Sequence, residues 1–167
     1  MRKGTPMSLF NVRGKRGALI AALILSNNVL ADFSLDLAPD TELHGTASDL
    51  GGSGNDILLT QDGSQNHASV TQVQAGSAYA GNDLTLSQSG TGNYANLLQH
   101  GYLNSAQLSQ NGEANIIDLS QTGIANHAGV TQVGNSNHAD VTQVGIGLSI
   151  IVTQYGDNNA AYVLQQN

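Results

Sequence analysis

The stretch "NHAGVTQVGNSNHADVTQVG", from Asn126 to Gly145, contains nearly the same eleven residues twice. Each copy begins with Asn, and the second, fourth and sixth residues after it are Ala, Val and Gln. The residues between these positions are His, Thr and either Gly or Asp. An alternation with a period of two is typical of a β-strand that buries one face. The stretch therefore predicts two strands, each followed by a turn.

The same unit recurs ten times between residues 55 and 167. Every unit has Gln six residues after its first position, and that first position is Asn in all units but one, where Leu148 replaces it. When units stack, these inward amides are expected to form ladders in which each amide donates to the next and accepts from the last. The predicted ladder residues are Asn55, Gln61, Asn66, Gln72, Asn82, Gln88, Asn93, Gln99, Asn104, Gln110, Asn115, Gln121, Asn126, Gln132, Asn137, Gln143, Gln154, Asn159 and Gln165.

A glycine follows most of these Gln residues by two positions, inside the four residues that separate one strand from the next. A tight turn needs a residue with positive φ, which glycine adopts without steric penalty. A right-handed coiled coil also has an eleven-residue period, but a glycine in nearly every unit would destabilise a helix by about 1 kcal/mol each time. We therefore expect strands, with turns at Gly63, Gly90, Gly101, Gly112, Gly123, Gly134, Gly145 and Gly156.

Two consecutive strands are expected to make one coil of a β-solenoid. The predicted fold class is all-β: strand-turn-strand coils in five 22-residue repeats, with two stacked parallel sheets and a cross-β amyloid core. Coils about 4.8 Å apart would place like residues above like. The predicted coils are 55–76, 82–103, 104–125, 126–147 and 148–167, with an insertion within 73–81 that shifts the register by five residues.

Charge divides the chain into two parts. The five Lys and Arg all lie within the first 16 residues, and the twelve Asp and Glu all lie from Asp32 onward. The basic start, the apolar run 17–25 and the small residues up to Ala31 predict a secretion signal over residues 1–31; a short buried helix is the alternative. Cleavage there would leave a mature chain with twelve acidic and no basic groups. Such a chain cannot neutralise phosphates, which argues against nucleic acid and anionic lipid as partners.

The histidines are the only candidates for a catalytic base or a metal ligand, because the chain has no Cys. His67, His127 and His138 all take the first outward position of a strand. The coil assignment places them on opposite sheets or three coils apart, so they do not converge. We expect no enzyme activity, no metal site and no cofactor.

An ice-binding β-solenoid is a second class of function. It needs a flat array of outward hydroxyls, and the fifth position after Asn is Ser or Thr in eight of the ten units. The neighbouring third position is irregular, and a single column is not a plane. A Ca²⁺-binding β-roll is disfavoured because its glycine-rich turns are absent. The hydroxyl column consists of Thr60, Thr71, Ser87, Ser109, Ser120, Thr131, Thr142 and Thr153.

The pattern Gln-x-Gly-x-x-Asn-x-Ala-x-x-x-Gln, as in "QTGIANHAGVTQ" from Gln121 to Gln132, resembles the curlin repeat. Curlins are the subunits of curli, the extracellular amyloid fibres of bacterial biofilms. The resemblance covers residues 55–167 in five repeats, behind a signal peptide as in that family. Residues 32–54 correspond in position to the curlin segment that addresses the outer-membrane secretion channel, and we expect this segment to be flexible.

The resemblance implies a secreted structural subunit that assembles into curli fibres for biofilm matrix and adhesion. Its partners would be other copies of itself, a related curlin subunit, an outer-membrane secretion channel and a periplasmic chaperone. The last repeat has no basic residue, which favours the major subunit over the nucleator. The alternatives are the nucleator, or a non-amyloid β-solenoid of the ice-binding or adhesin type.

Three further expectations concern assembly. The chain stops two residues after Gln165, so the last coil is expected to present an uncovered edge that templates the first coil of another subunit. Leu148 interrupts one Asn ladder beside that edge, or simply fills an apolar niche. Four outward acidic residues act either as gatekeepers against premature stacking or as plain solubilising charges: Asp56, Asp83, Asp118 and Asp140.

Overall fold

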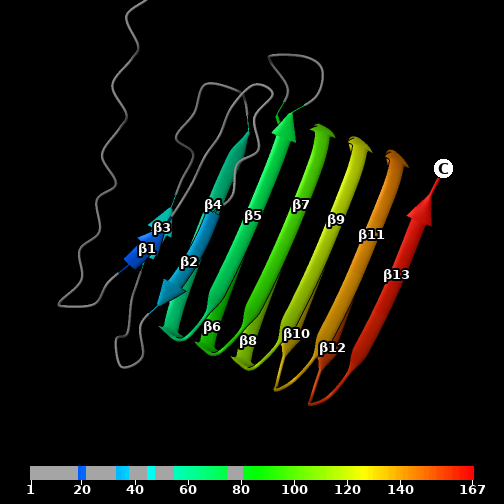
Figure 1. Ribbon diagram of the computed structural model, residues 1–167. Coiled ribbons are helices and arrows are strands. Elements are labelled where there is room, and N and C mark those ends of the chain that lie inside the picture. Colours follow the sequence, from blue (N-terminus) through cyan, green and yellow to red (C-terminus); the bar gives the residue numbers. More distant parts are fainter. Residues whose placement is uncertain (1–18, 22–32, 38–44, 48–54, 75–80) are drawn as a thin grey trace, which may run out of the picture.

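The computed structural model describes residues 19–21, 33–37, 45–47, 55–74 and 81–167. Thirteen strands lie in these ranges, which contain no helix. Ten of them, β4 to β13, follow one another as five strand pairs (Figure 1). Their bounds are β4 (Asp56–Ser64), β5 (His67–Gln74), β6 (Asp83–Thr91), β7 (Tyr94–Tyr102), β8 (Ser105–Glu113), β9 (Ile116–Ile124), β10 (His127–Val133), β11 (His138–Ile146), β12 (Ser149–Tyr155) and β13 (Ala160–Gln166).

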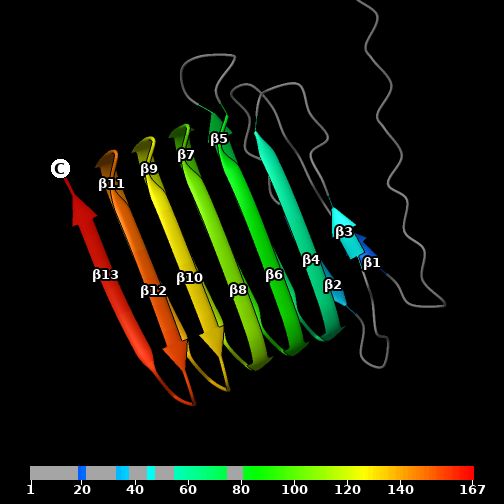
Figure 2. The same cartoon turned by 180° about the vertical axis from the view of Figure 1, so that it is seen from behind.

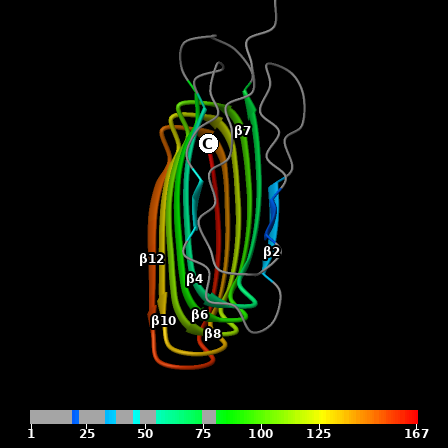
Figure 3. The same ribbon diagram turned by 90° about the vertical axis from the view of Figure 1, so that its left-hand side faces the viewer.

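The ten strands alternate between two sheets. Odd-numbered strands form one sheet, in the order β5-β7-β9-β11-β13, and even-numbered strands form the other, in the order β12-β10-β8-β6-β4 (Figures 1 and 2). Neighbouring strands within each sheet are parallel and in register. Viewed down the stack, the coils superpose as nested loops with one sheet on each side (Figure 3). The predicted all-β solenoid of two parallel sheets is therefore confirmed.

Three short strands precede the coils, namely β1 (Leu19–Ala21), β2 (Phe33–Leu37) and β3 (Gly45–Ala47). All three pair antiparallel: β1 with β2, β2 with β5, and β3 with β4. β2 and β3 lie inside segment 32–54, for which the sequence led us to expect a flexible chain. The rest of that segment, the remainder of the predicted signal 1–31 and residues 75–80 of the insertion lie outside the described residues.

The core is a narrow aliphatic strip between the sheets. The strands bury alternate residues, because successive side chains of a strand point to opposite faces. All twenty aliphatic residues at the second and fourth inward positions belong to this strip, and seventeen of them are buried. The other three, Ile150, Ala161 and Val163, are only partly buried and belong to the last coil. The strip is bounded at both ends by the Asn and Gln columns, which are buried except at Asn159 and Gln165 in the last coil.

Each turn that the structure describes in full contains two residues with positive φ. One is the glycine that follows Gln by two positions, as at Gly112 and Gly123, where φ is 129° and 125°. The other immediately precedes the next ladder position and has φ between 54° and 68°. This second residue is glycine in two turns only; elsewhere it is Gln65, Leu103, Ala114, Ala125, Ser136 or Asn158. The repeating pair of left-handed residues closes the chain from one sheet to the other.

Candidate functional site

The Gln side chains form two continuous columns, one per sheet. In the even-numbered sheet, Gln61, Gln88 and the Gln residues above them are linked by Nε2-to-Oε1 hydrogen bonds of 2.5–3.0 Å. In the odd-numbered sheet the column from Gln72 to Gln165 has bonds of 2.6–2.9 Å. In all eight bonds the earlier coil donates and the later coil accepts. The Gln ladders are therefore polar, and they give the stack a direction.

The second amide hydrogen of these Gln residues is also used. Gln110 Nε2 donates to the carbonyl oxygen of Tyr94 at 3.0 Å, and Gln121 Nε2 donates to that of Ser105 at 3.1 Å. In each case the acceptor is the first residue of a strand in the opposite sheet. The Gln columns thus hold the two sheets together as well as linking successive coils. A buried amide with both hydrogens and its oxygen bonded carries no desolvation penalty of the kind that an unpaired one would.

The Asn columns run in the opposite sense. Asn104 donates through Nδ2 to Asn82 Oδ1 at 3.0 Å, and its backbone N–H donates to the same oxygen at 3.1 Å. The remaining Nδ2 hydrogens bond turn carbonyls, as Asn115 does to Gly134 at 2.8 Å. Each Asn oxygen therefore accepts from the coil that follows it. The Asn side chains fix the turns to the stack and oppose the direction of the Gln ladder.

Leu148 keeps half of the Asn interaction. Its backbone N–H still donates to Asn126 Oδ1 at 3.0 Å. A leucine, however, has no amide to donate and no oxygen to offer to a coil beyond it. The Asn column of the even-numbered sheet therefore ends at Asn126, whereas that of the odd-numbered sheet continues to Asn159.

The turn glycines stack so closely that no side chain fits. A Cβ atom added to Gly63, Gly90 or Gly112 would overlap the carbonyl oxygen of the turn glycine in the next coil. In the second turn column Gly101 and Gly123 have the same arrangement, and a Cβ added to Gly145 would overlap the side-chain oxygen of Asn167. At Gly156, in the last coil, the nearest atom to an added Cβ is Asn159 Nδ2 at 3.8 Å. The site thus needs glycine for its φ everywhere, and for space wherever another coil follows.

The two ends of the ladders carry complementary groups. In the first coil the Oε1 atoms of Gln61 and Gln72 are buried and have no hydrogen-bond partner. In the last coil the Nε2 atoms of Gln154 and Gln165 each donate to one backbone carbonyl, at 3.0 and 3.2 Å, which leaves one hydrogen on each amide. The first coil therefore has two unused acceptors, and the last coil has two donors to match them.

The four predicted gatekeepers form two like-charged pairs on the outer faces. Asp56 and Asp83 are register partners in neighbouring strands, and so are Asp118 and Asp140. Partial burial raises the pKa of Asp83 above its usual value, and the negative charge of Asp56 raises it further. In the other pair, Asp118 lies 3.5 Å from the Nε2 of His138 and accepts a 3.4 Å hydrogen bond from Asn96.

The histidines in the described part of the chain do not come together. His67 stacks on Tyr94 with ring centroids 5.0 Å apart, and His138 meets Tyr162 edge-on at 5.5 Å. His127 lies on the other sheet. The sequence pattern did not indicate these aromatic contacts, which arise because in-register stacking brings outward residues of neighbouring coils together. The described residues hold no group of three His, Cys, Asp or Glu that could bind a metal ion.

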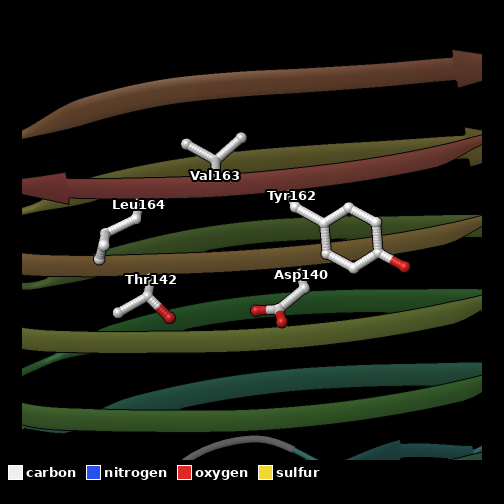
Figure 4. A pocket seen from close by; sticks show the side chains of 5 residues that line it. All are labelled: Asp140, Thr142, Tyr162, Val163 and Leu164. Carbon is white, nitrogen blue, oxygen red and sulfur yellow. The ribbon is translucent and has the colours of Figure 1, made fainter.

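A hollow of about 250 Å³ lies on the odd-numbered sheet beside its open edge. It is lined by residues of the last two strands of that sheet: Asp140, Thr142, Tyr162, Val163 and Leu164 (Figure 4). Asp140 is the only ionisable acid or base in this lining apart from the phenol of Tyr162. The hollow therefore lacks the converging groups that a catalytic site requires.

The curlin associated repeat matches the chain over residues 80–112, 90–123 and 112–145. These ranges cover the interior coils, where the Gln and Asn columns are continuous. The searches of curated proteins and of solved structures found no match. No helix among the described residues is long and apolar enough to cross a membrane. The interior coils thus carry the curlin associated repeat, in agreement with the resemblance found in the sequence.

Proposed function

We propose that the mature chain is a secreted subunit that assembles head to tail into extracellular curli-type amyloid fibres. The last coil of one copy would receive the first coil of the next, so that both sheets run on through the junction. Fibres built in this way would form biofilm matrix and mediate adhesion. Residue 148 would then meet residue 55 across the junction, and Gln154 and Gln165 would meet Gln61 and Gln72.

The complementarity of the Gln ladder ends is the observation that supports this proposal most. A junction of last coil on first coil would supply both unused acceptors, Gln61 Oε1 and Gln72 Oε1, with donors. A buried unpaired amide oxygen destabilises a protein by about 1–3 kcal/mol, so closing the junction removes two such penalties. A head-to-head junction would place two donor ends or two acceptor ends together. The ladder therefore favours a polar fibre.

The remaining edge groups agree with this arrangement. β12 and β13 are the terminal strands of their sheets within the described residues. Unpaired strand edges are templates for pairing with another chain. The partly buried Ile150, Ala161 and Val163 would become fully covered by a following coil.

The purified mature chain, residues 32–167, tests the proposal at micromolar concentration. We expect fibres by electron microscopy, thioflavin fluorescence, a 4.7 Å meridional reflection and faster growth with preformed seeds. A chain that stays monomeric for days with neither signal contradicts the proposal. Mass spectrometry of the exported protein tests the signal over residues 1–31, and we expect the mature chain to begin at Asp32.

We further propose that the chain is a major subunit and not the nucleator, because its last repeat carries no basic residue. Its partners would be copies of itself, a related curlin subunit, an outer-membrane secretion channel and a periplasmic chaperone. Unseeded assembly with a long lag that a related nucleating curlin abolishes would support this role. A short lag, together with the ability to seed a second curlin, would support the nucleator role instead.

An ice-binding function has one observation in its favour. In every strand of the even-numbered sheet, the fifth residue after the Asn position is Ser or Thr. These residues form an unbroken outer column of Thr60, Ser87, Ser109, Thr131 and Thr153. The adjacent column is Leu58, Thr85, Gln107, Gly129 and Ile151, which is neither flat nor uniform. A thermal-hysteresis assay separates the two functions, and we expect no hysteresis.

A further inference from the structure

The face of the first coil is partly covered by the chain's own N-terminal strands. β2 pairs antiparallel with β5, from Phe33 opposite Val70 to Asp36 opposite His67. β3 pairs antiparallel with β4, from Gly45 opposite Gln61 to Ala47 opposite Leu59. Both strands belong to the predicted mature chain, whereas β1 lies in the predicted signal peptide. A first coil that is paired in this way cannot also pair with another subunit.

We propose that β2 and β3 are an autoinhibitory cap on the first coil, and that a second copy of this chain displaces them when it docks its last coil there. This inference rests on the proposed head-to-tail assembly. It adds that each junction must open one cap before it can form. The opposite face, made by β12 and β13, has no comparable cover within the described residues.

The cap pairs with part of the backbone edge, at Leu59–Gln61 of β4 and His67–Val70 of β5, but it does not continue the ladder. It runs antiparallel to the coil, so its residues do not match the parallel columns. Gln61 lies opposite Gly45, which has no side chain with which to donate a hydrogen bond. The register of β2 ends at Val70, two residues short of Gln72. These are the two Gln residues whose buried Oε1 atoms lack a partner.

A second copy would satisfy both the backbone edge and the ladder. The last coil repeats the spacing of all coils, so Gln154 and Gln165 would fall on the Gln61 and Gln72 columns. Each has one amide hydrogen left to donate. The incoming coil would therefore pair with the backbone of β4 and β5, as the cap does, and would add two amide bonds that the paired residues of the cap do not make. On hydrogen bonding alone, the second copy is the better occupant of the face.

The cap has a compensating advantage, because it is tethered to the same chain. A tethered segment acts at an effective concentration on the order of millimolar, far above that of a micromolar subunit in solution. A free subunit therefore keeps its cap, and assembly waits for an encounter with a fibre end. The cap therefore slows the docking of a second copy, and the extra amide bonds make the docked state the more stable one.

An engineered disulfide can lock the cap in place. The chain has no cysteine of its own, so the two introduced cysteines have no native thiol to compete with them. Ser34 and Ser69 are register partners in β2 and β5. Directly opposite antiparallel residues have Cα atoms about 4.5–5.5 Å apart, within the usual range for a disulfide. The test protein is mature S34C/S69C. The matched control is S69C/N96C, which keeps the same position in β5 but links it to β7 within the body of the solenoid.

The experiment compares oxidised and reduced forms of each protein in elongation of wild-type seeds. We expect oxidised S34C/S69C to elongate at least tenfold more slowly than the same sample after reduction. The control should elongate equally in both redox states. Backbone amides of residues 33–37 should exchange slowly in the free subunit and quickly in fibres.

Two results would overturn the proposal that β2 and β3 cap the first coil. One is equal elongation by oxidised and reduced S34C/S69C while seeds and wild-type protein behave normally. The other is failure of the two cysteines to form a disulfide in the free subunit under oxidising conditions. Failure of the proposed function looks different: wild-type protein would not elongate seeds at all, and the cap inference would fall with it.

Discussion

The first and last coils have the same sequence pattern but opposite surroundings. Ile57 and Leu59 of the first coil are 2% and 1% exposed, and β2 and β3 pair with its strands. In the last coil Ile150 and Val163 are only partly buried, and no described strand lies beyond them. The first coil has unused amide acceptors and the last has unused amide donors. Repeats of one pattern thus become different surfaces according to which neighbour is absent.

This difference means that a single substitution should act differently at each position in the stack. A substitution in an interior coil meets another coil of the same chain, so it should damage the subunit itself. A substitution on the outer side of the last coil meets a neighbour only in the fibre, so it should damage assembly alone.

The largest effect is expected for Gly112→Ala. Gly112 has φ of 129°, and an added Cβ would overlap the carbonyl oxygen of Gly134 in the next coil. Backbone strain and the clash together should destabilise the stack by about 3 kcal/mol or more. Circular dichroism of the fresh subunit should show lost β-structure, and fibre yield should fall. Gly129→Ala is the control, because the nearest atom to its added Cβ would belong to the Ile151 side chain, at an ordinary 3.6 Å. Equal behaviour of the two variants would refute the close stacking of the turns.

Gly156→Ala should separate folding from assembly. Its φ of 93° is strained for alanine, but nothing within 3.8 Å obstructs the new Cβ. The subunit should lose only about 1–2 kcal/mol. In a head-to-tail fibre the Cβ would meet the turn glycine of the next copy, Gly63, so seeded elongation should slow by tenfold or more. Thioflavin fluorescence measures the elongation rate. If this variant elongated as fast as the wild-type protein, the result would argue against stacking of the last coil on the first coil.

Leu148→Asn should strengthen the junction. The new side chain would extend the Asn column beyond Asn126 and offer an oxygen to Asn55 of the next subunit, whose buried Nδ2 has no partner. One added hydrogen bond contributes about 1 kcal/mol, so guanidinium should dissolve these fibres at a higher concentration than wild-type fibres. Slower growth with an unchanged fold would indicate instead that Leu148 fills an apolar niche.

The smallest effect concerns acid. Burial and the charge of Asp56 raise the pKa of Asp83 in the fold, so the folded chain binds its proton more readily than the unfolded chain. Stability should therefore rise as pH falls through the folded pKa of Asp83 toward its ordinary value of 3.8. Asp83→Asn should be more stable at neutral pH by less than about 1 kcal/mol, as expected for relief of a like-charged cross-strand pair. Denaturation between pH 7 and 4 checks this, and a variant that keeps the full acid-induced gain would exclude Asp83 as its source.

Much of this fold could be predicted because each repeat has the same alternation of inward and outward residues and the same turn glycine. Alternation around "NHAGVTQ" sets the strands, and the glycine two residues after Gln supplies positive φ. The second left-handed residue of the turn could not be predicted, because it varies from Leu103 to Ala114 to Ser136. Its conformation is imposed by stacking on the neighbouring turn and not by its side chain.

The N-terminal strands were also beyond prediction. β2 and β3 have no repeat partner in the sequence, and their pairing follows from the free edge that the first coil leaves. The direction of the Gln ladder could not be predicted either. The Gln spacing predicts a ladder, but only the positions of the first-strand carbonyls determine which amide hydrogen remains to reach the next coil.

Cross-linking between subunits tests the head-to-tail junction most directly. Thr60→Cys lies in the first coil and Thr153→Cys lies in the last, at equivalent outward positions of one sheet. Fibres grown from an equal mixture of the two single variants would be treated with a short bis-maleimide. We predict products that join residue 60 of one copy to residue 153 of another, identified by mass spectrometry. Products that join 60 to 60 and 153 to 153 with no mixed species would contradict the account.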